Sequence, residues 1–243
     1  MKYFFQLIFL FTSLFSLDFQ NGVCQNSAAF EKLKEGIQFH YARDFENAIQ
    51  SYSEAIELHP EMSMAFFNRG KSYYELSLFE EAKQDFTNAL SFDSILVEAF
   101  YWGGECQLRL GKYKEAASDF QRAIALNPTH KKAQHGVGVS FYYQRKYQEA
   151  IQVYNQILKE DDKDAQAFYK RGLAKLYDTD YEGSIQDFTQ TFELNPSHFL
   201  ALEMRGVAFQ KNNNINEACK NWKEALLMGS EAAVDFYKKY CSE

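Results

Sequence analysis

The stretch GECQLRLGKYKEAASDFQRAIALNP, residues 104–128, contains the spacing that decides the fold. Gly104 is followed 12 residues later by Ala116 and 16 residues later by Phe120. Pro128 closes the stretch 24 residues after the glycine. The same spacing recurs along the chain every 34 residues without an insertion. The glycines that begin it are Gly36, Gly70, Gly104, Gly138, Gly172 and Gly206.

A small residue and an aromatic residue follow each of these glycines at fixed distances. The small residues, 12 positions on, are Ala48, Ala82, Ala116, Ala150, Ser184 and Ala218. The aromatic residues, 16 positions on, are Tyr52, Phe86, Phe120, Tyr154, Phe188 and Trp222. We expect the glycine and the small residue to lie on the facing sides of two helices, where short side chains let the backbones approach closely.

The three prolines punctuate the same period. They lie 68 residues apart, which is two units of 34, at Pro60, Pro128 and Pro196. Proline cannot continue an α-helix and restricts the residue before it, so each proline is expected to mark the end of a second helix. In the intervening units we expect the replacing residue to cap the helix that follows. These residues are Ser94, Asp162 and Ser230.

The pattern resembles the tetratricopeptide repeat, a 34-residue helix-turn-helix unit with Gly at position 8, Ala at 20, an aromatic residue at 24 and Pro at 32. The resemblance implies an all-α fold, a right-handed α-solenoid of six repeats with a terminal helix that covers the last apolar face. The repeats are expected at residues 29–62, 63–96, 97–130, 131–164, 165–198 and 199–232, and the capping helix at residues 233–243. Position 11, usually aromatic, is Gln107 in repeat 3 and Lys175 in repeat 5, which predicts looser packing there.

Residues 1–24 are predicted to be a secretory signal peptide. Lys2 is followed by an uncharged, apolar stretch over residues 3–17. As a helix this stretch reaches only about 22 Å, less than the ~30 Å hydrocarbon core of a bilayer. Cleavage before Gln25 would export the chain to the periplasm, the cell surface or a secretory compartment. An uncleaved membrane anchor and lipid attachment at Cys24 are the alternatives.

Composition narrows the functional classes. The net charge of −7, without a cluster of Lys and Arg, disfavours nucleic acid as a partner. Neither a catalytic signature nor a metal-ligand spacing is present, so we expect no enzyme activity, cofactor or metal site. Cys106 is expected in the core. Cys219 and Cys241 could pair in an oxidising compartment, or remain free.

The resemblance further implies that the first helices of the repeats line a concave groove. The candidate partner-binding residues of that groove are Phe67, Lys71, Tyr74, Tyr101, Glu105, Lys132, His135, Tyr142 and Tyr169. Their aromatic character suits an apolar or extended peptide, although packing between repeats explains it equally well. The carboxylate clamp of chaperone-binding members is not matched, because Leu33, Ile37, Glu98 and Trp102 occupy its positions.

The sequence thus predicts a non-catalytic protein-protein interaction scaffold that binds a peptide or protein partner. Contact with a membrane is expected only through the N-terminal leader, if the leader is uncleaved. The alternative is a structural module of an envelope or secretory complex that assembles with copies of itself.

Overall fold

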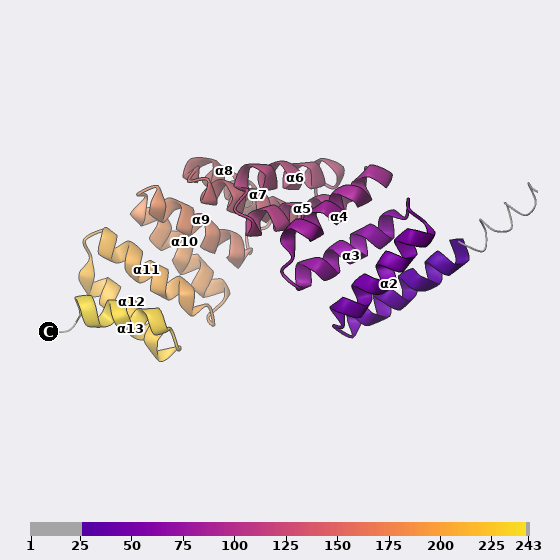
Figure 1. Cartoon of the computed structure of the whole chain (residues 1–243). Helices are drawn as coiled ribbons and strands as arrows, with labels where there is room; N and C mark the ends of the chain where they lie inside the picture. The colour runs from indigo at the N-terminus through magenta and orange to yellow at the C-terminus, as the bar shows by residue number, and fades with distance from the viewer. Residues whose placement is uncertain (1–25, 242–243) are drawn as a thin grey trace, which may run out of the picture. The chain divides into compact units, whose positions relative to one another are not determined.

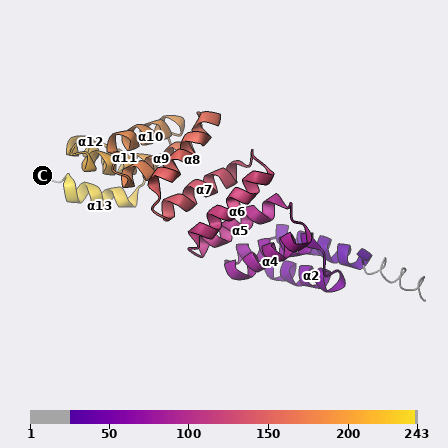
Figure 2. The same ribbon diagram turned by 90° about the horizontal axis from the view of Figure 1, so that it is seen from above.

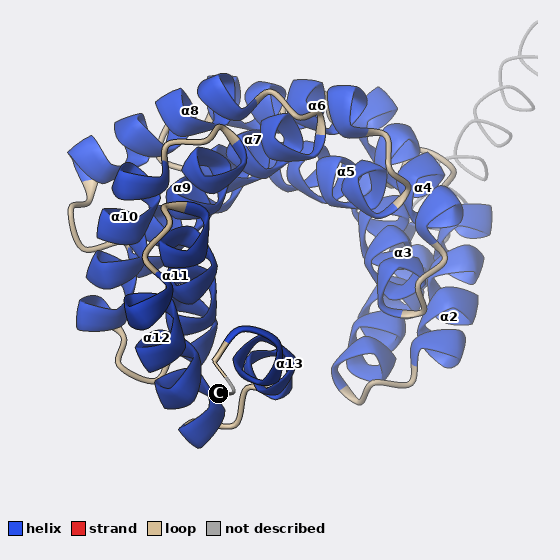
Figure 3. Cartoon of the chain, turned by 90° about the vertical axis from the view of Figure 1, so that its left-hand side faces the viewer, coloured by secondary structure: helices blue, strands red, loops and turns tan. Residues whose placement is uncertain are grey.

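The computed structural model describes residues 26–241, and every regular element in that range is an α-helix (Figure 3). The expected signal peptide at residues 1–24 lies outside the described residues. No helix within residues 26–241 is long and apolar enough to cross a membrane. The prediction of an all-α repeat fold is confirmed for this part of the chain.

The chain divides into two compact units, called below the N-terminal half, Met1–Gly111, and the C-terminal half, Lys112–Glu243. In the N-terminal half, a helix described over residues 26–41 precedes α2 (Phe45–Leu58), α3 (Ser63–Glu75), α4 (Phe79–Phe92) and α5 (Val97–Arg109). The C-terminal half contains α6 (Tyr113–Leu126), α7 (Lys131–Tyr143), α8 (Tyr147–Glu160), α9 (Ala165–Tyr177), α10 (Tyr181–Leu194), α11 (Phe199–Lys211), α12 (Ile215–Leu227) and α13 (Glu231–Tyr240). Within each half, consecutive helices pack side by side (Figures 1 and 2).

In five of the repeats the glycine and the aromatic residue meet where the two helices pack, at Gly36, Gly70, Gly138, Gly172 and Gly206. In repeat 5 a Cβ atom added to Gly172 would lie 2.9 Å from the Phe188 ring, closer than packed atoms tolerate. The glycine therefore lets α9 and α10 approach around the ring. The six aromatic side chains of this position are at most 1% exposed, so each adds roughly 1.5–3 kcal/mol of apolar burial to the core. They are Tyr52, Phe86, Phe120, Tyr154, Phe188 and Trp222.

The turn inside each repeat uses one residue in the left-handed backbone region. This residue lies at position 15 of all six repeats, with φ between 60° and 73°. A left-handed residue after the first helix is a common way to end a helix and reverse the chain. Glycine adopts this conformation without strain, yet only one repeat uses it. The residues are Arg43, Ser77, Gly111, Arg145, Thr179 and Asn213.

The predicted helix caps are correct at one position and wrong at two. Ser230 caps α13, because its Oγ accepts the Ala233 N–H at 3.2 Å. α9, in contrast, is capped by Asp164 and not by Asp162. α5 begins after Leu96, without a side-chain cap, and not at Ser94. After the second helix the chain makes a further turn, which delays the next helix by two residues.

Two histidines cap helices for which no capping residue was predicted. The Nδ1 atom of His130 accepts the Ala133 N–H at 3.1 Å, at the start of α7. His198 does the same for Ala201 at the start of α11, at 3.2 Å. Both rings satisfy a backbone donor that the first turn of a helix leaves unpaired.

The terminal helix α13 covers the end of the last repeat. It begins at Glu231, two residues before the expected boundary. The chain turns at Gly229, where φ is +97°, and Ser230 then caps the helix. The Trp222 indole of α12 stacks on Phe236 and Tyr240, with ring centroids 5.2 and 5.6 Å apart. Cys219 and Cys241 form a disulfide, which resolves the pairing that the sequence left open.

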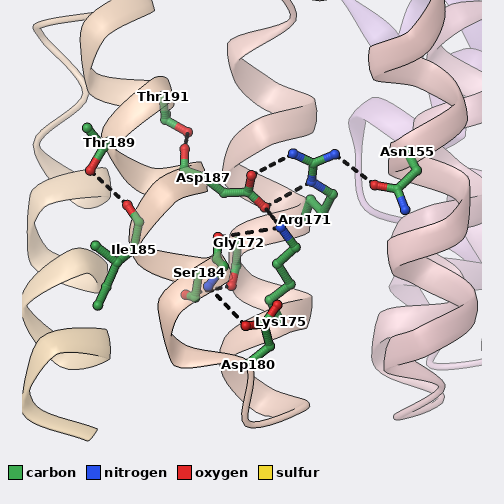
Figure 4. A network of polar contacts seen from close by, with 11 residues as sticks. Asn155, Arg171, Gly172, Lys175, Asp180, Ser184, Ile185, Asp187, Thr189 and Thr191 are labelled. Atoms are coloured by element: carbon green, nitrogen blue, oxygen red, sulfur yellow. Dashed lines mark hydrogen bonds and ion pairs between the residues drawn. The ribbon is translucent and has the colours of Figure 1, made fainter. Parts of the chain in front are cut away.

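The expectation of looser packing at Gln107 and Lys175 is wrong. Gln107 is only 7% exposed. The Lys175 ammonium forms an ion pair with Asp187, with Nζ and Oδ2 2.9 Å apart. Arg171 donates two hydrogen bonds to the same carboxylate, at 2.9 and 2.6 Å (Figure 4). Arg171 also donates to Asn155 of the preceding repeat at 2.7 Å. Lys175 is therefore part of a polar network that links α8, α9 and α10.

Candidate functional site

The sequence-predicted binding residues fall into two groups, one in each half. Those of the N-terminal half, together with Trp102, are called the N-terminal patch, and those of the C-terminal half are called the C-terminal patch. The N-terminal patch contains Phe67, Lys71, Tyr74, Tyr101, Trp102 and Glu105, on α3 and α5. The C-terminal patch contains Lys132, His135, Tyr142 and Tyr169, on α7 and α9.

The N-terminal patch is organised around Trp102. The Tyr74 and Tyr101 rings meet the indole edge to face, with centroids 5.1 and 5.4 Å away. The Lys71 ammonium lies 5.9 Å from the indole and 6.0 Å from the Phe67 ring, a cation–π arrangement. Phe67 itself is only 8% exposed, so it supports the patch from below and is not available to a partner.

Burial governs the ionisation of the tyrosines in this patch. It raises the pKa of Tyr101, and the nearby Glu105 carboxylate raises it further. Burial also raises the pKa of Tyr74. Both phenols are therefore neutral near pH 7 and can act as hydrogen-bond donors.

The two tyrosines of the C-terminal patch contact different neighbouring rings. Tyr142 contacts the Tyr147 and Tyr177 rings at 5.8 and 5.7 Å. Tyr169 packs on Phe188 and His198, at 5.7 and 4.6 Å. Each tyrosine thus packs against neighbouring rings while part of its surface remains exposed.

The two other predicted residues of this patch play different parts. His135 is held by the Asp164 carboxylate, with Nε2 and Oδ2 2.8 Å apart and both side chains 13% exposed. Its ring is therefore engaged inside the protein. Lys132 is exposed and lines no described cavity.

A cavity of about 110 Å³ opens beside Tyr142 in the C-terminal half. α7 and α9 supply its apolar walls through Val139 and Leu173. Its polar lining includes Tyr154 of α8 and Lys170 of α9, neither of which was among the sequence-predicted site residues. The lining residues are Val139, Tyr142, Tyr143, Tyr154, Lys170 and Leu173.

A second cavity of about 360 Å³ lies on other faces of the same half. α6, α7 and α8 line it with mainly apolar side chains, among them Ile124, Val137, Val153 and Ile157. No titratable residue except Glu160 contributes to its lining. Within residues 26–241, no group of three or more His, Cys, Asp and Glu side chains could hold a metal ion. The arrangement is thus suited to binding through rings and single polar groups.

Sequence comparison identifies the family. The family model described as "Tetratricopeptide repeat" matches residues 33–94 and 104–165, half of the chain. Together with the helix pairs described above, this match shows that the chain belongs to the tetratricopeptide repeat family. The fold is a protein-protein interaction scaffold, and members of the family are generally non-catalytic. No curated protein matches the sequence.

Solved structures with the same fold include PilW, PilF and YrrB. PilW, described as a widely conserved type IV pilus biogenesis factor, has a TM-score of 0.72 and 19% identity over 86% of this chain and 97% of its own. PilF of Pseudomonas aeruginosa has a TM-score of 0.69 and 15% identity over 88% and 99%. YrrB, described as having an unusual peptide-binding site, has a TM-score of 0.63 and 20% identity over 77% and 97%. At these identities the likeness is one of fold.

Proposed function

We propose that this protein is a non-catalytic scaffold that binds a peptide or protein partner, in an exported compartment, through the N-terminal and C-terminal patches. The observation that carries the proposal is the concentration of partly exposed tyrosines on the first helices of the repeats. Tyrosine buries a large area at a low cost in side-chain entropy, and it is enriched among the residues that dominate binding energy.

The C-terminal patch continues into a wider tyrosine surface. Tyr142 contacts Tyr143, and the Tyr143 ring stacks on Tyr113 at 5.1 Å. Tyr147 stacks on Tyr177 at 5.7 Å. The Tyr143 and Tyr177 side chains are 53% and 57% exposed. Packing between repeats does not require rings with so much exposed surface, so this surface favours a partner over the purely structural interpretation.

Two features support export. The apolar stretch over residues 3–17, preceded by Lys2, has the composition of a signal peptide. The Cys219–Cys241 disulfide is typical of an oxidising compartment. Cleavage before Gln25, an intact anchor and a lipid at Cys24 give three different masses for the protein isolated from its cells. An unmodified, full-length chain in the cytosolic fraction would contradict export.

The binding proposal is tested with peptides selected on the purified protein from a random library. Changing Tyr101, Tyr142 and Tyr169 together to Ser should weaken binding of the selected peptides at least tenfold, since each ring truncation at a binding centre typically costs over 1 kcal/mol. The matched control changes Ile95 and Leu227 to Ser. These two side chains are 70% and 77% exposed and lie outside both patches.

The control variant should bind as the wild type does. Circular dichroism and the melting temperature report whether each variant folds. If the folded triple variant keeps full affinity for every selected peptide, the two patches are not the binding surface.

Light scattering on the protein without its leader tests the alternative function, self-assembly. A particle mass that stays at one chain over the concentration range would contradict self-assembly. A particle mass that increases with concentration would support self-assembly, provided that the Ile95→Ser and Leu227→Ser changes abolish the increase.

A further inference from the structure

The 110 Å³ cavity of the C-terminal half contains a buried phenol with no hydrogen-bond partner. Tyr154 is fully buried, and among the described residues its hydroxyl has none. Three of the other repeats place a phenylalanine at this position, so the core does not require a polar ring. In repeat 6 the polar ring atom is satisfied, because the Trp222 Nε1–H donates to the Glu203 carbonyl at 3.2 Å. The Tyr154 hydroxyl is thus an exception to the rule that buried polar groups are hydrogen-bonded, and a bound group such as a water or an ion would satisfy it.

The second polar group of the cavity is a cation without an anion. Lys170 makes no hydrogen bond or ion pair with the described residues, and its ammonium lies 5.9 Å from the Tyr169 ring. Burial alone lowers the pKa of Lys170, without a contribution from a nearby carboxylate. Lys175 and Lys131 of the same half, in contrast, pair with Asp187 and Asp161.

The chemistry of the lining selects the ligand. An ammonium and a neutral phenol both donate hydrogen bonds, and burial keeps the Tyr154 phenol neutral by raising its pKa. None of the six lining residues is a carboxylate, and the Asp164 carboxylate, whose charge also raises the Tyr154 pKa, is engaged by His135 at 2.8 Å. Val139 and Leu173 add apolar walls. A volume of about 110 Å³ is well below the roughly 300–1,000 Å³ of sites for whole small molecules, so it accommodates one side chain or one chain end.

We propose that Lys170 and Tyr154 form a subsite that binds a carboxylate of the peptide partner, either an Asp or Glu side chain or a C-terminus. The inference rests on the proposed function and specifies that the bound group of the partner is negatively charged. The use of a core tyrosine from a second helix distinguishes this subsite from the carboxylate clamp, whose residues all lie on first helices.

The test uses two libraries of octapeptides on the purified protein. One library contains Asp and Glu and has free C-termini, and the other lacks both residues and is amidated. The proposal predicts that peptides from the first library bind more tightly. Lys170→Met should weaken their binding roughly tenfold or more, since a hydrogen bond to a charged group contributes 1.5 kcal/mol or more. Tyr154→Phe should weaken it by a smaller factor.

The choice of variants separates binding from folding. Met keeps most of the Lys170 stem, and Phe keeps the Tyr154 ring, so both variants should fold. Tyr154→Phe also removes an unsatisfied polar atom, so its melting temperature should equal or exceed that of the wild type. The matched controls are Tyr52→Phe, at the same position of repeat 1, and Lys220→Met, at an exposed lysine. Neither control should change the affinity.

The source of the carboxylate follows from single changes in a selected peptide. Loss of binding on amidation identifies the C-terminus, and loss on replacing Glu by Gln or Asp by Asn identifies a side chain. Selected peptides that bind Lys170→Met as tightly as the wild type, yet lose affinity for the triple tyrosine variant, overturn the subsite alone. If neither library yields saturable binding, the proposed function fails, and the subsite with it.

Discussion

Removing the Cys219–Cys241 disulfide should release α13 from the end of the last repeat. The two cysteines are 22 residues apart in the sequence. Closing a loop of that length in the unfolded chain is worth about 3 kcal/mol at 25 °C in the chain-entropy model. α13 has only 10 residues, which is too short for a helix to be stable alone. Ala233 is its one fully buried side chain, so the disulfide should supply much of its attachment.

The perturbation is the double change of Cys219 and Cys241 to Ser. We expect urea to unfold the last repeat of the variant at a lower concentration, with a loss of about 3 kcal/mol. Trp222 reports the change directly, because its indole stacks on Phe236 of α13. A Trp102→Phe background leaves Trp222 as the single tryptophan, so fluorescence then follows this region alone.

A reducing agent provides the matched control. It should lower the midpoint of the wild type to that of the double variant, and it should leave the variant unchanged. Alkylation of the unreduced wild type should leave Cys219 and Cys241 unlabelled. The reasoning would be refuted if the unreduced wild type and the variant had equal urea midpoints. Labelling of both cysteines before reduction would also refute it.

Three further changes test the packing, the turns and the pH dependence of stability. Asp187→Ala should lower the free energy of unfolding by about 3–5 kcal/mol, because it leaves the largely buried Arg171 guanidinium without its carboxylate. A loss below about 1 kcal/mol, measured by urea unfolding, would count against this network. Thr179→Asn should raise the free energy of unfolding by up to about 1 kcal/mol, because Thr179 has φ +70° and asparagine tolerates the left-handed region better; a decrease would contradict the assigned strain. Burial, and secondly the charge of Lys71, lower the pKa of His40, so the unfolded chain binds the proton more readily than the folded one. Stability should be complete above the ordinary histidine pKa of about 6.5 and fall as the pH drops from there through the folded pKa, and His40→Gln should flatten the melting temperature between pH 7 and 5.

The candidate site could be predicted only in part from the sequence. Position within the 34-residue period assigns a residue to a helix face, and the three predicted site residues Tyr74, Tyr101 and Tyr142 lie on the first helices with partly exposed side chains. Periodicity does not report what a neighbouring repeat does with that face. Phe67 was selected by the same rule, and the structure buries it against Phe86 at a centroid distance of 5.7 Å.

The sequence by itself determined the class of fold and the place of its helices. Gly172 and Phe188, 16 residues apart, are complementary in size, and the same complementarity recurs at the 34-residue period. Its physical basis is local, since the spacing that brings a glycine of one helix opposite the ring of the next is set within one repeat. The prolines, at twice that period, then follow the ends of α2, α6 and α10.

The tertiary structure alone decided which polar groups find partners. Lys175 meets Asp187, and His135 meets Asp164, whereas Lys170 and the Tyr154 hydroxyl line the same cavity without partners. Each outcome depends on ångström-scale distances between side chains of different helices, and the spacing along the chain does not contain them. The pairing of Cys219 with Cys241 is decided in the same way, because it requires α13 to fold back on α12.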